Sequence, residues 1–524
     1  MKIHSIRLNF GFVLLLISLS ACTDWFDLRP QSETIHEEFW KDESDVKSMV
    51  GSCYREMNEP SFLERLIVWG EVRSDNVVKG MNPNRDITYL LNLGLNSTNS
   101  YTYWNDFYKV INYCNNVIYY APDVRKMDPN FTEGQLRAYL AEVKGIRALC
   151  YFTLVRTFKD IPFVTKPTIG DSESFEVAQS TPEFVVDFLI EDLKSCENNA
   201  VSGYENKNYD KGRMTQKSIR ALLADLYLWK DDYENCITYC NKILDDQSTG
   251  LVLEPSAVYN KNVFIDGNSK ESIFELQFDA KNIQNYVIYE MYEKSGGNFV
   301  AGSRPGYNTY QLSSYDFANK TTLFGKSDLR GKNAYQPVSS GAFFPIMKYI
   351  ANPIANLSGT VSESDYQMTV SSPNWIFYRL PDIYLMKAEA LVEIGGQPNL
   401  EEAFGLVSKT YDRANPDLGI GSLQFSNFNS QAMMRDLVLD ERQREFMFEG
   451  KRYFDLMRRI HREGTPTNVV GTYLMKKYAF LDQATAESRL SDMNALFMPI
   501  NANELKLNTL LKQNPFYTIS SDIE

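Results

Sequence analysis

Apolar side chains recur at intervals of three and four residues along most of the chain, which places them on one face of an amphipathic helix. This pattern predicts helices over residues 104–115 and 136–158. Pro162 lies just beyond the second helix, as expected for a residue that cannot continue it. Thr181 and Pro182 predict the start of a further helix, with threonine as N-cap and proline at the first helical position. The chain is therefore predicted to be mainly helical.

Two segments, 218–244 and 382–411, repeat one arrangement of an apolar helix, a short turn and a second apolar helix. Small residues, among them Ala224 and Ala388, stand where the two helices would touch. Tetratricopeptide-like hairpins have this pattern, and they bury their apolar faces only by stacking on neighbouring hairpins. We therefore predict an all-α fold in which such hairpins stack in a right-handed superhelix.

Three stretches interrupt the helical pattern. Residues 271–278 alternate between apolar and polar side chains, which predicts one short strand. Residues 281–325 and 351–373 are rich in glycine, serine, asparagine or threonine and predict long irregular loops. Only minor β-structure is expected.

The first 21 residues have the pattern of a secretory signal. Lys2 and Arg7 precede an apolar run over residues 10–19, which is too short to span a bilayer. The sequence from Leu19 to Cys22 resembles a bacterial lipobox, which implies cleavage before Cys22 and acylation of that cysteine. The mature protein would then be held at a membrane by lipid. A plain secretory signal followed by an incidental cysteine is the alternative.

Charge and length restrict the class of protein. The formal charge is −13, and removal of residues 1–21 would take away two basic and no acidic residues, leaving −15. A chain this acidic, with no basic run, argues against nucleic acid or anionic lipid as a partner. No later segment has 18 consecutive apolar residues, so we expect no membrane-spanning helix.

Cysteine and histidine are placed unfavourably for metal or redox chemistry. Six cysteines remain after Cys22, with no C-x-x-C spacing, and most lie in apolar helical surroundings, which favours buried thiols over a disulfide framework. Of three histidines, His4 lies in the signal and the other two, His36 and His461, are far apart. We therefore predict no metal site, no cofactor and no histidine-dependent triad.

Blocks of residues in a fixed order from end to end resemble the SusD/RagB family of nutrient-binding outer-membrane lipoproteins. The matching blocks are Glu37–Trp40, Trp104–Asn116, Glu142–Arg156, Tyr378–Asp382, Glu441–Leu456 and Gln513–Tyr517. One departure concerns export: the acidic patch that commonly follows the family's lipidated cysteine is here split, with Trp25 and Phe26 between Asp24 and Asp27.

The resemblance implies a cell-surface role. It implies a lipoprotein of the outer membrane, facing the cell exterior, that captures an oligosaccharide and passes it to a SusC-like TonB-dependent transporter, over whose barrel it acts as a lid. It also implies that residues 22–245 and 246–524 pack as one body, although length alone would suggest two or more domains.

The charged segment 441–458 could suggest catalysis, because paired carboxylates hydrolyse glycosides. Its acids, however, alternate with Arg442, Arg444, Arg452 and Arg458 at helical spacing, which favours structural ion pairs. No nucleophile elbow or phosphate-binding glycine loop is present either. We predict that the protein is not an enzyme.

A sugar site needs aromatic platforms and planar polar groups at their edges. In the family the N-terminal region contributes to the ligand groove, and two loop tyrosines are further candidates. The predicted ligand-binding residues are Asp75, Asn76, Arg85, Trp104, Asn105, Tyr292 and Tyr307. Trp104 could instead be a core residue, and Asp75 and Asn76 could belong to a turn or N-cap.

Two other functions stay open on the sequence. The first keeps the fold and the transporter partner but replaces the glycan with peptide cargo, as in some relatives of the family. The second is a surface glycoside hydrolase, which would need a carboxylate pair in a cleft.

Overall fold

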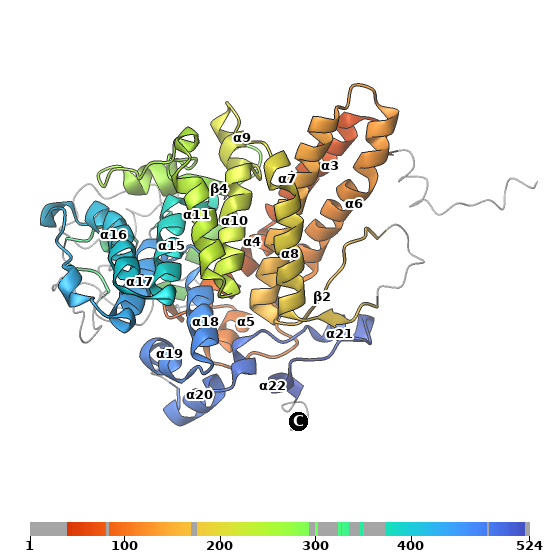
Figure 1. Ribbon diagram of the computed structural model, residues 1–524. Coiled ribbons are helices and arrows are strands. Elements are labelled where there is room, and N and C mark those ends of the chain that lie inside the picture. Colours follow the sequence, from red (N-terminus) through yellow and green to blue (C-terminus); the bar gives the residue numbers. More distant parts are fainter. Residues whose placement is uncertain are drawn as a thin grey trace, which may run out of the picture.

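The computed structural model describes residues 39–79, 83–168, 176–292, 299–301, 323–325, 327–334, 346, 348–349, 372–478 and 481–518 (Figure 1). Helices dominate these residues, as predicted, and they pack largely as antiparallel hairpins between neighbours in sequence. None of the helices in these ranges is long and apolar enough to cross a membrane.

The N-terminal half builds a row of long helices. Thr132 caps the longest of them, α7, through a capping box with Gln135, and Thr181 caps α8 by accepting from the Phe184 amide, as its sequence predicted. The helices of this half are α3 (Glu43–Met57), α4 (Pro60–Ile67), α5 (Arg85–Leu91), α6 (Asn105–Met127), α7 (Glu133–Phe158), α8 (Pro182–Cys196), α9 (Lys207–Gly212), α10 (Gln216–Trp229) and α11 (Tyr233–Leu244).

The C-terminal half adds a second group of helices beside α10 and α11. The two predicted hairpins are the pairs α10–α11 and α15–α16, and α11 packs on α15, so the two halves meet there (Figure 1). The helices of this half are α12 (Tyr286–Tyr292), α14 (Leu329–Ala334), α15 (Leu380–Ile394), α16 (Gln397–Ala414), α17 (Gln431–Phe446), α18 (Arg452–Glu463), α19 (Thr467–Val469), α20 (Gln483–Leu490), α21 (Ala502–Leu507) and α22 (Pro515–Thr518).

Strands form three short antiparallel pairs in the described residues. They are β1 (Val77–Lys79) with β5 (Phe299–Ala301), β2 (Ile161–Pro162) with β3 (Gln179–Ser180), and β4 (Ser272–Leu276) with β6 (Trp375–Arg379). The predicted strand at 271–278 is therefore confirmed as β4. All five of its residues are buried, so its alternating pattern reflects polar side chains satisfied inside the protein.

The apolar core crosses the boundary between the sequence halves. One cluster of buried side chains runs from Trp40 to Leu511, and a smaller cluster lies between α15, α16 and α17. Gly70 and Gly450 mark the closest approach: a Cβ on Gly70 would lie 1.8 Å from the Gly450 carbonyl oxygen, and Gly450 itself has a φ of +72°. Glycine at both positions lets the backbones of the two halves touch.

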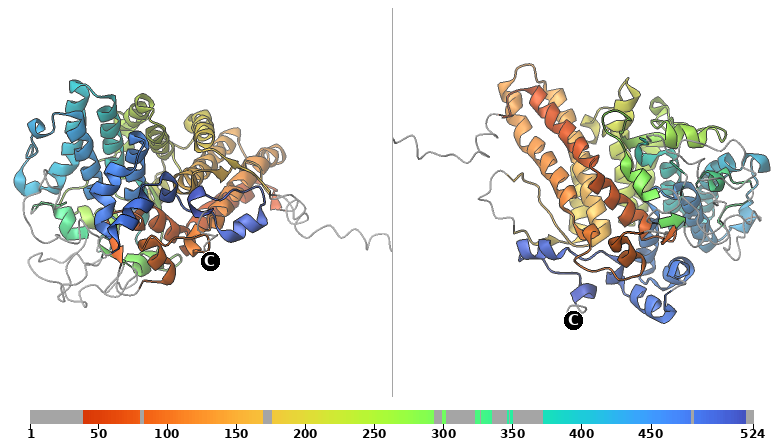
Figure 2. Two further views of the ribbon diagram at one scale, coloured as in Figure 1. Left: turned by 90° about the horizontal axis from the view of Figure 1, so that it is seen from below. Right: turned by 180° about the vertical axis from the view of Figure 1, so that it is seen from behind.

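The end of the chain returns to the N-terminal half. The Met498 amide donates to the Thr157 carbonyl at 2.8 Å, and the Ala502 amide donates to the Ser97 carbonyl at 2.8 Å. The Asn508 side chain donates to the Val177 carbonyl at 2.8 Å. As a result α21 and α22 lie beneath α6, α7 and α8 (Figure 1 and Figure 2). This return places α21 against the start of α6, where the largest cavity described below is found.

Candidate functional site

Polar side chains are concentrated in two regions. One is a buried ionic cluster around α17 and α18, and the other is a cavity between α6 and α21. The ionic cluster contains the charged segment that the sequence assigned to ion pairs. Arg379 contacts Glu445 at 2.5 Å and Glu449 at 2.8 Å, and all three residues are nearly inaccessible. Arg330 contacts Glu441 at 2.7 Å and Glu445 at 2.8 Å. The prediction of structural ion pairs is confirmed.

The cations of this cluster hold Glu445 and Glu449 in their ionised form. Burial opposes ionisation of Glu445, but Arg413, Arg379 and Arg330 hold its pKa well below the ordinary value. Burial likewise opposes ionisation of Glu449, whose pKa Arg379 and Lys348 nevertheless lower to about 2. Carboxylates held in this way cannot donate a proton near neutral pH, so they are poorly suited to general-acid chemistry.

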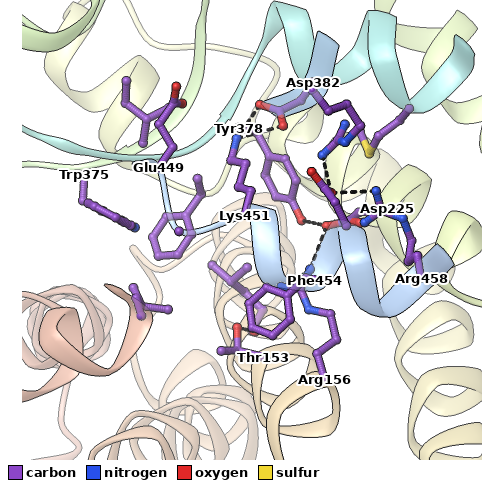
Figure 3. Close-up of a pocket in the computed structure, with 18 residues that line it drawn as sticks. Thr153, Arg156, Asp225, Trp375, Tyr378, Asp382, Glu449, Lys451, Phe454 and Arg458 are labelled. Carbon is purple, nitrogen blue, oxygen red and sulfur yellow. Dashed lines mark hydrogen bonds and ion pairs between the residues drawn. The ribbon is translucent and has the colours of Figure 1, made fainter. Parts of the chain in front are cut away.

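A small charged pocket opens between this cluster and α7, as Figure 3 shows. The Tyr378 hydroxyl donates to Asp225 at 2.9 Å, and Lys451 contacts Asp382 at 2.6 Å. Its volume of ≈ 60 Å³ leaves room for a few water molecules and none for a sugar ring. The charged pocket is therefore part of the core.

The cavity between α6 and α21 is far larger, at ≈ 510 Å³, which lies in the range of small-molecule sites. Its walls come from the first half of α6, the segment 162–168 after β2, and α21. The lining residues are Trp104, Asn105, Tyr108, Ile111, Asn112, Asn115, Pro162, Val164, Lys166, Pro167, Thr168, Val177, Glu504, Leu507, Asn508 and Leu511.

Several polar groups of this cavity hold its walls together. The Tyr108 hydroxyl donates to the Pro162 carbonyl at 2.6 Å, and the Asn112 side chain accepts from the Thr168 amide at 2.9 Å. The Asn115 side chain donates to the Val164 carbonyl at 3.0 Å. These bonds fix the segment 162–168 against α6, so the cavity is formed before any ligand enters.

Trp104, Asn105 and Glu504 add further polar groups to the lining, beside Lys166 and Asn508. Trp104 is 3% exposed, because its ring packs edge-to-face on Tyr108 and Phe158 at 5.7 and 5.2 Å. Trp104 is therefore a core residue that also lines the cavity, and its role as a ligand contact stays a prediction. Asn105 is exposed. Burial raises the pKa of Glu504, and a hydrogen bond from Trp104 opposes this rise.

Asp75 and Asn76 lie elsewhere, with both side chains fully buried. Arg452 donates to Asp75 at 2.8 Å, and Gln443 donates to Asn76 at 2.8 Å. Asn76 in turn donates to Glu71 at 2.6 Å. These two side chains join η1 (Val68–Val72) and the turn after it to α17 and α18, and neither offers a surface to a ligand. We do not retain them as ligand contacts.

The other predicted residues are scattered. Arg85 is exposed on α5, with its guanidinium 5.3 Å from the ring of Tyr89, itself 38% exposed. Tyr292 is buried, stacks on Tyr349 and donates its hydroxyl to the Phe448 carbonyl at 2.9 Å, which leaves no face open for stacking on a sugar. Tyr307 and Cys22 lie outside the described residues.

Sequence reasoning missed Glu504 and Asn508 as cavity residues. Both sit about four hundred positions beyond Trp104; Glu504 lies on α21 and Asn508 directly follows it, in the closing part of the chain that resembles the family. Only the return of the chain end brings them to the cavity.

Comparison with known proteins agrees with this architecture. Residues 333–517 match the family described as "SusD family", and residues 24–228 match the one described as "Starch-binding associating with outer membrane". A relative, SusD-like protein P38 of Formosa agariphila, is 25% identical over 494 residues, which cover 87% of this chain and 92% of the relative.

Solved structures share the fold. A SusD superfamily protein from Bacteroides vulgatus superimposes with a TM-score of 0.72 at 20% identity, covering 91% of this chain and 100% of the other. A protein described as "Laminarin binding SusD-like protein" superimposes with a TM-score of 0.66 at 21% identity, covering 91% and 99%. With matches to both halves and to whole relatives, this chain belongs to the SusD/RagB family.

Proposed function

We propose that this protein is a non-catalytic glycan-binding lipoprotein of the outer membrane. In this proposal it captures an oligosaccharide outside the cell and passes it to a SusC-like TonB-dependent transporter, over which it acts as a lid. Acylated Cys22 anchors it with its body facing the exterior. The relative described as laminarin-binding supports a carbohydrate ligand.

The observation that carries the proposal is the preformed cavity between α6 and α21. Its volume of ≈ 510 Å³ suits one or two sugar units, and most of its wall is apolar. Asn105 and Glu504 supply an amide and a carboxylate at its edge, groups that bond to sugar hydroxyls. Apolar wall and planar polar edge together suit the C–H faces and hydroxyl rim of a pyranose.

The exposed pair Arg85 and Tyr89 is a second candidate contact. An exposed ring with a guanidinium beside it offers a stacking face and donors for hydroxyls. The pair lies on α5, outside the lining of the cavity, so the two candidates can be tested separately.

Binding by the mature protein tests the proposal directly. Titration calorimetry against laminarin, followed by a panel of oligosaccharides, is expected to yield a ligand, and a reducing-end assay is expected to detect no release of sugar. Asn105→Ala should weaken binding roughly 3- to 10-fold, the worth of one hydrogen bond, with no change in melting temperature. Arg85→Ala should have a similar effect only if the ligand reaches α5.

The matched control is Asn130→Ala, which removes an exposed asparagine just beyond the other end of α6. It should leave affinity unchanged. Turnover that survives repurification would refute the non-catalytic role. Binding of peptides, with no glycan bound across the panel, would favour the peptide-cargo alternative.

A further inference from the structure

Two thiols from different helices face each other in the core. Cys53 lies on α3 and Cys114 on α6, and their Sγ atoms are 3.7 Å apart. Both side chains are completely buried. They are separated by 61 positions in sequence, so a bond between them would join distant parts of the chain.

The two sulfur atoms are in van der Waals contact as free thiols. A disulfide has an S–S length of about 2.05 Å, so the two sulfur atoms need to approach by less than 2 Å. The Cys53 Sγ lies between the two helices, 3.5 Å from the Met49 carbonyl of its own helix and 3.7 Å from the Cys114 sulfur of α6. The pair Cys236 and Cys240 differs, because both lie on α11 and a bond would link only neighbouring turns.

We propose that Cys53 and Cys114 are joined by a disulfide bond in the exported protein. The inference rests on the export that the proposed function includes, because disulfides persist in oxidising compartments. An exported thiol–disulfide oxidoreductase in its disulfide form is the oxidant. One cysteine thiolate attacks that disulfide, and the second displaces the enzyme from the mixed disulfide. The two protons lost by the protein thiols are taken up by the two enzyme sulfurs through solvent, so the enzyme leaves as the dithiol.

Burial also decides when the bond forms. It raises the pKa of the Cys53 thiol well above its ordinary value, so the thiolate needed for exchange is scarce once α3 has docked. Oxidation therefore precedes or accompanies the docking of α3 on α6, and the finished bond is shielded from reductants.

The position of the bond suggests its purpose. Among the described residues α3 is the helix nearest in sequence to Cys22, so in the proposed lipoprotein a pull on the anchor reaches α3 before the rest of the described body. Without the bond, α3 is held by packing on α6 and α7 and by polar contacts such as the 2.6 Å bond from Tyr54 to Glu142. A covalent link to α6 would stop α3 from peeling away.

Mass spectrometry of the protein recovered from the outer membrane of an exporting cell tests this proposal. After denaturation and alkylation without reduction, four of the six cysteines beyond Cys22 should react, and a linked peptide should contain Cys53 and Cys114. Reaction of all six, or a different linked pair, would overturn it. Glycan binding by the same preparation reports separately on the proposed function.

Variants provide the controls. Cys150→Ala, in the same thiol cluster, should keep the linked peptide, whereas Cys53→Ala should leave Cys114 reactive. Reduction should lower the melting temperature of the unmodified sequence by about 3–6 °C, and that of Cys53→Ala by less than 1 °C, because only the former loses a closed loop. Equal shifts in both proteins would contradict the proposed link.

Discussion

The ionic cluster and the α6–α21 cavity use polar side chains in opposite ways. In the cluster, Arg379 and Glu445 are wholly buried and satisfy each other and their neighbours. In the cavity, Asn105 lies exposed at the edge and Glu504 is half-buried. A polar group whose partners all lie within the protein stabilises the fold, whereas one that faces an open volume can bind a ligand.

This difference shows that a high density of charged residues does not by itself mark a binding site. The cluster brings Glu441, Glu445 and Glu449 together, yet all three are enclosed, Glu445 and Glu449 are held ionised, and the adjacent pocket of ≈ 60 Å³ is too small for a sugar. The cavity has one carboxylate and several amides around ≈ 510 Å³. Volume and access therefore favour the cavity as the proposed ligand site, although the cluster has more charged residues.

Removal of one cation from the cluster is expected to have the largest effect. Arg379→Met would leave Glu445 and Glu449 buried without their shared partner, which should lower the free energy of unfolding by about 3–5 kcal/mol or more. Urea unfolding followed by circular dichroism measures this change. Arg85→Met, an exposed arginine, is the control and should change it by less than about 0.5 kcal/mol. Similar losses of stability in both variants would refute the proposed difference between the buried and the exposed arginine.

The second largest effect is expected at acidic pH, where protonation of Glu449 should lower the stability of the protein. The pKa of Glu449 is about 2 in the folded protein and near 4.5 when unfolded, so the unfolded state takes up the proton first as pH falls. Stability that is complete above pH 4.5 should thus fall between about pH 4.5 and 2, by on the order of 3 kcal/mol from this residue. Urea midpoints at several pH values check this. A free energy that is flat below pH 4.5 would contradict it.

Most of the helical fold could be predicted because its signals are local. The hairpin α10–α11 follows from apolar spacing and a short turn, and Thr181 marks the start of α8. Strand β6 was not predicted. Its Arg379 can be buried because it pairs with acids more than sixty positions away, and no local sequence pattern indicates those partners. Local sequence patterns therefore predicted the helices, whereas the strand that was not predicted depends on partners far away in the sequence.

The site was less accessible to sequence reasoning for the same reason. Asp75 was chosen by its position, yet its partner Arg452 lies 377 positions away. Trp104 and Asn105 were found because they begin a recognisable helix, whereas Glu504 reaches them only through the returning chain end. A cavity assembled from three separate segments has no contiguous motif.

The walls of the cavity can be loosened without disturbing the ionic cluster. Tyr108→Phe removes the hydroxyl that donates to the Pro162 carbonyl at 2.6 Å and keeps the ring. Stability should fall by about 1 kcal/mol, the typical worth of one hydrogen bond, and ligand affinity should fall a few-fold as the 162–168 segment loses its position. Calorimetry of unfolding and of binding measures both. Unchanged affinity would show that this wall does not shape the site.

The smallest expected effect concerns the single carboxylate of the cavity. An ionised carboxylate accepts stronger hydrogen bonds from sugar hydroxyls than a neutral group does, so affinity should decline as pH falls through the pKa of Glu504, which burial raises. Glu504→Gln should bind about 3-fold more weakly at pH 7 and show no such decline. Binding measured from pH 7 to 4 checks this, with protein stability followed in parallel. If both proteins lose affinity together as the pH falls, the decline arises from the acids of the ionic cluster, and Glu504 does not contact the ligand.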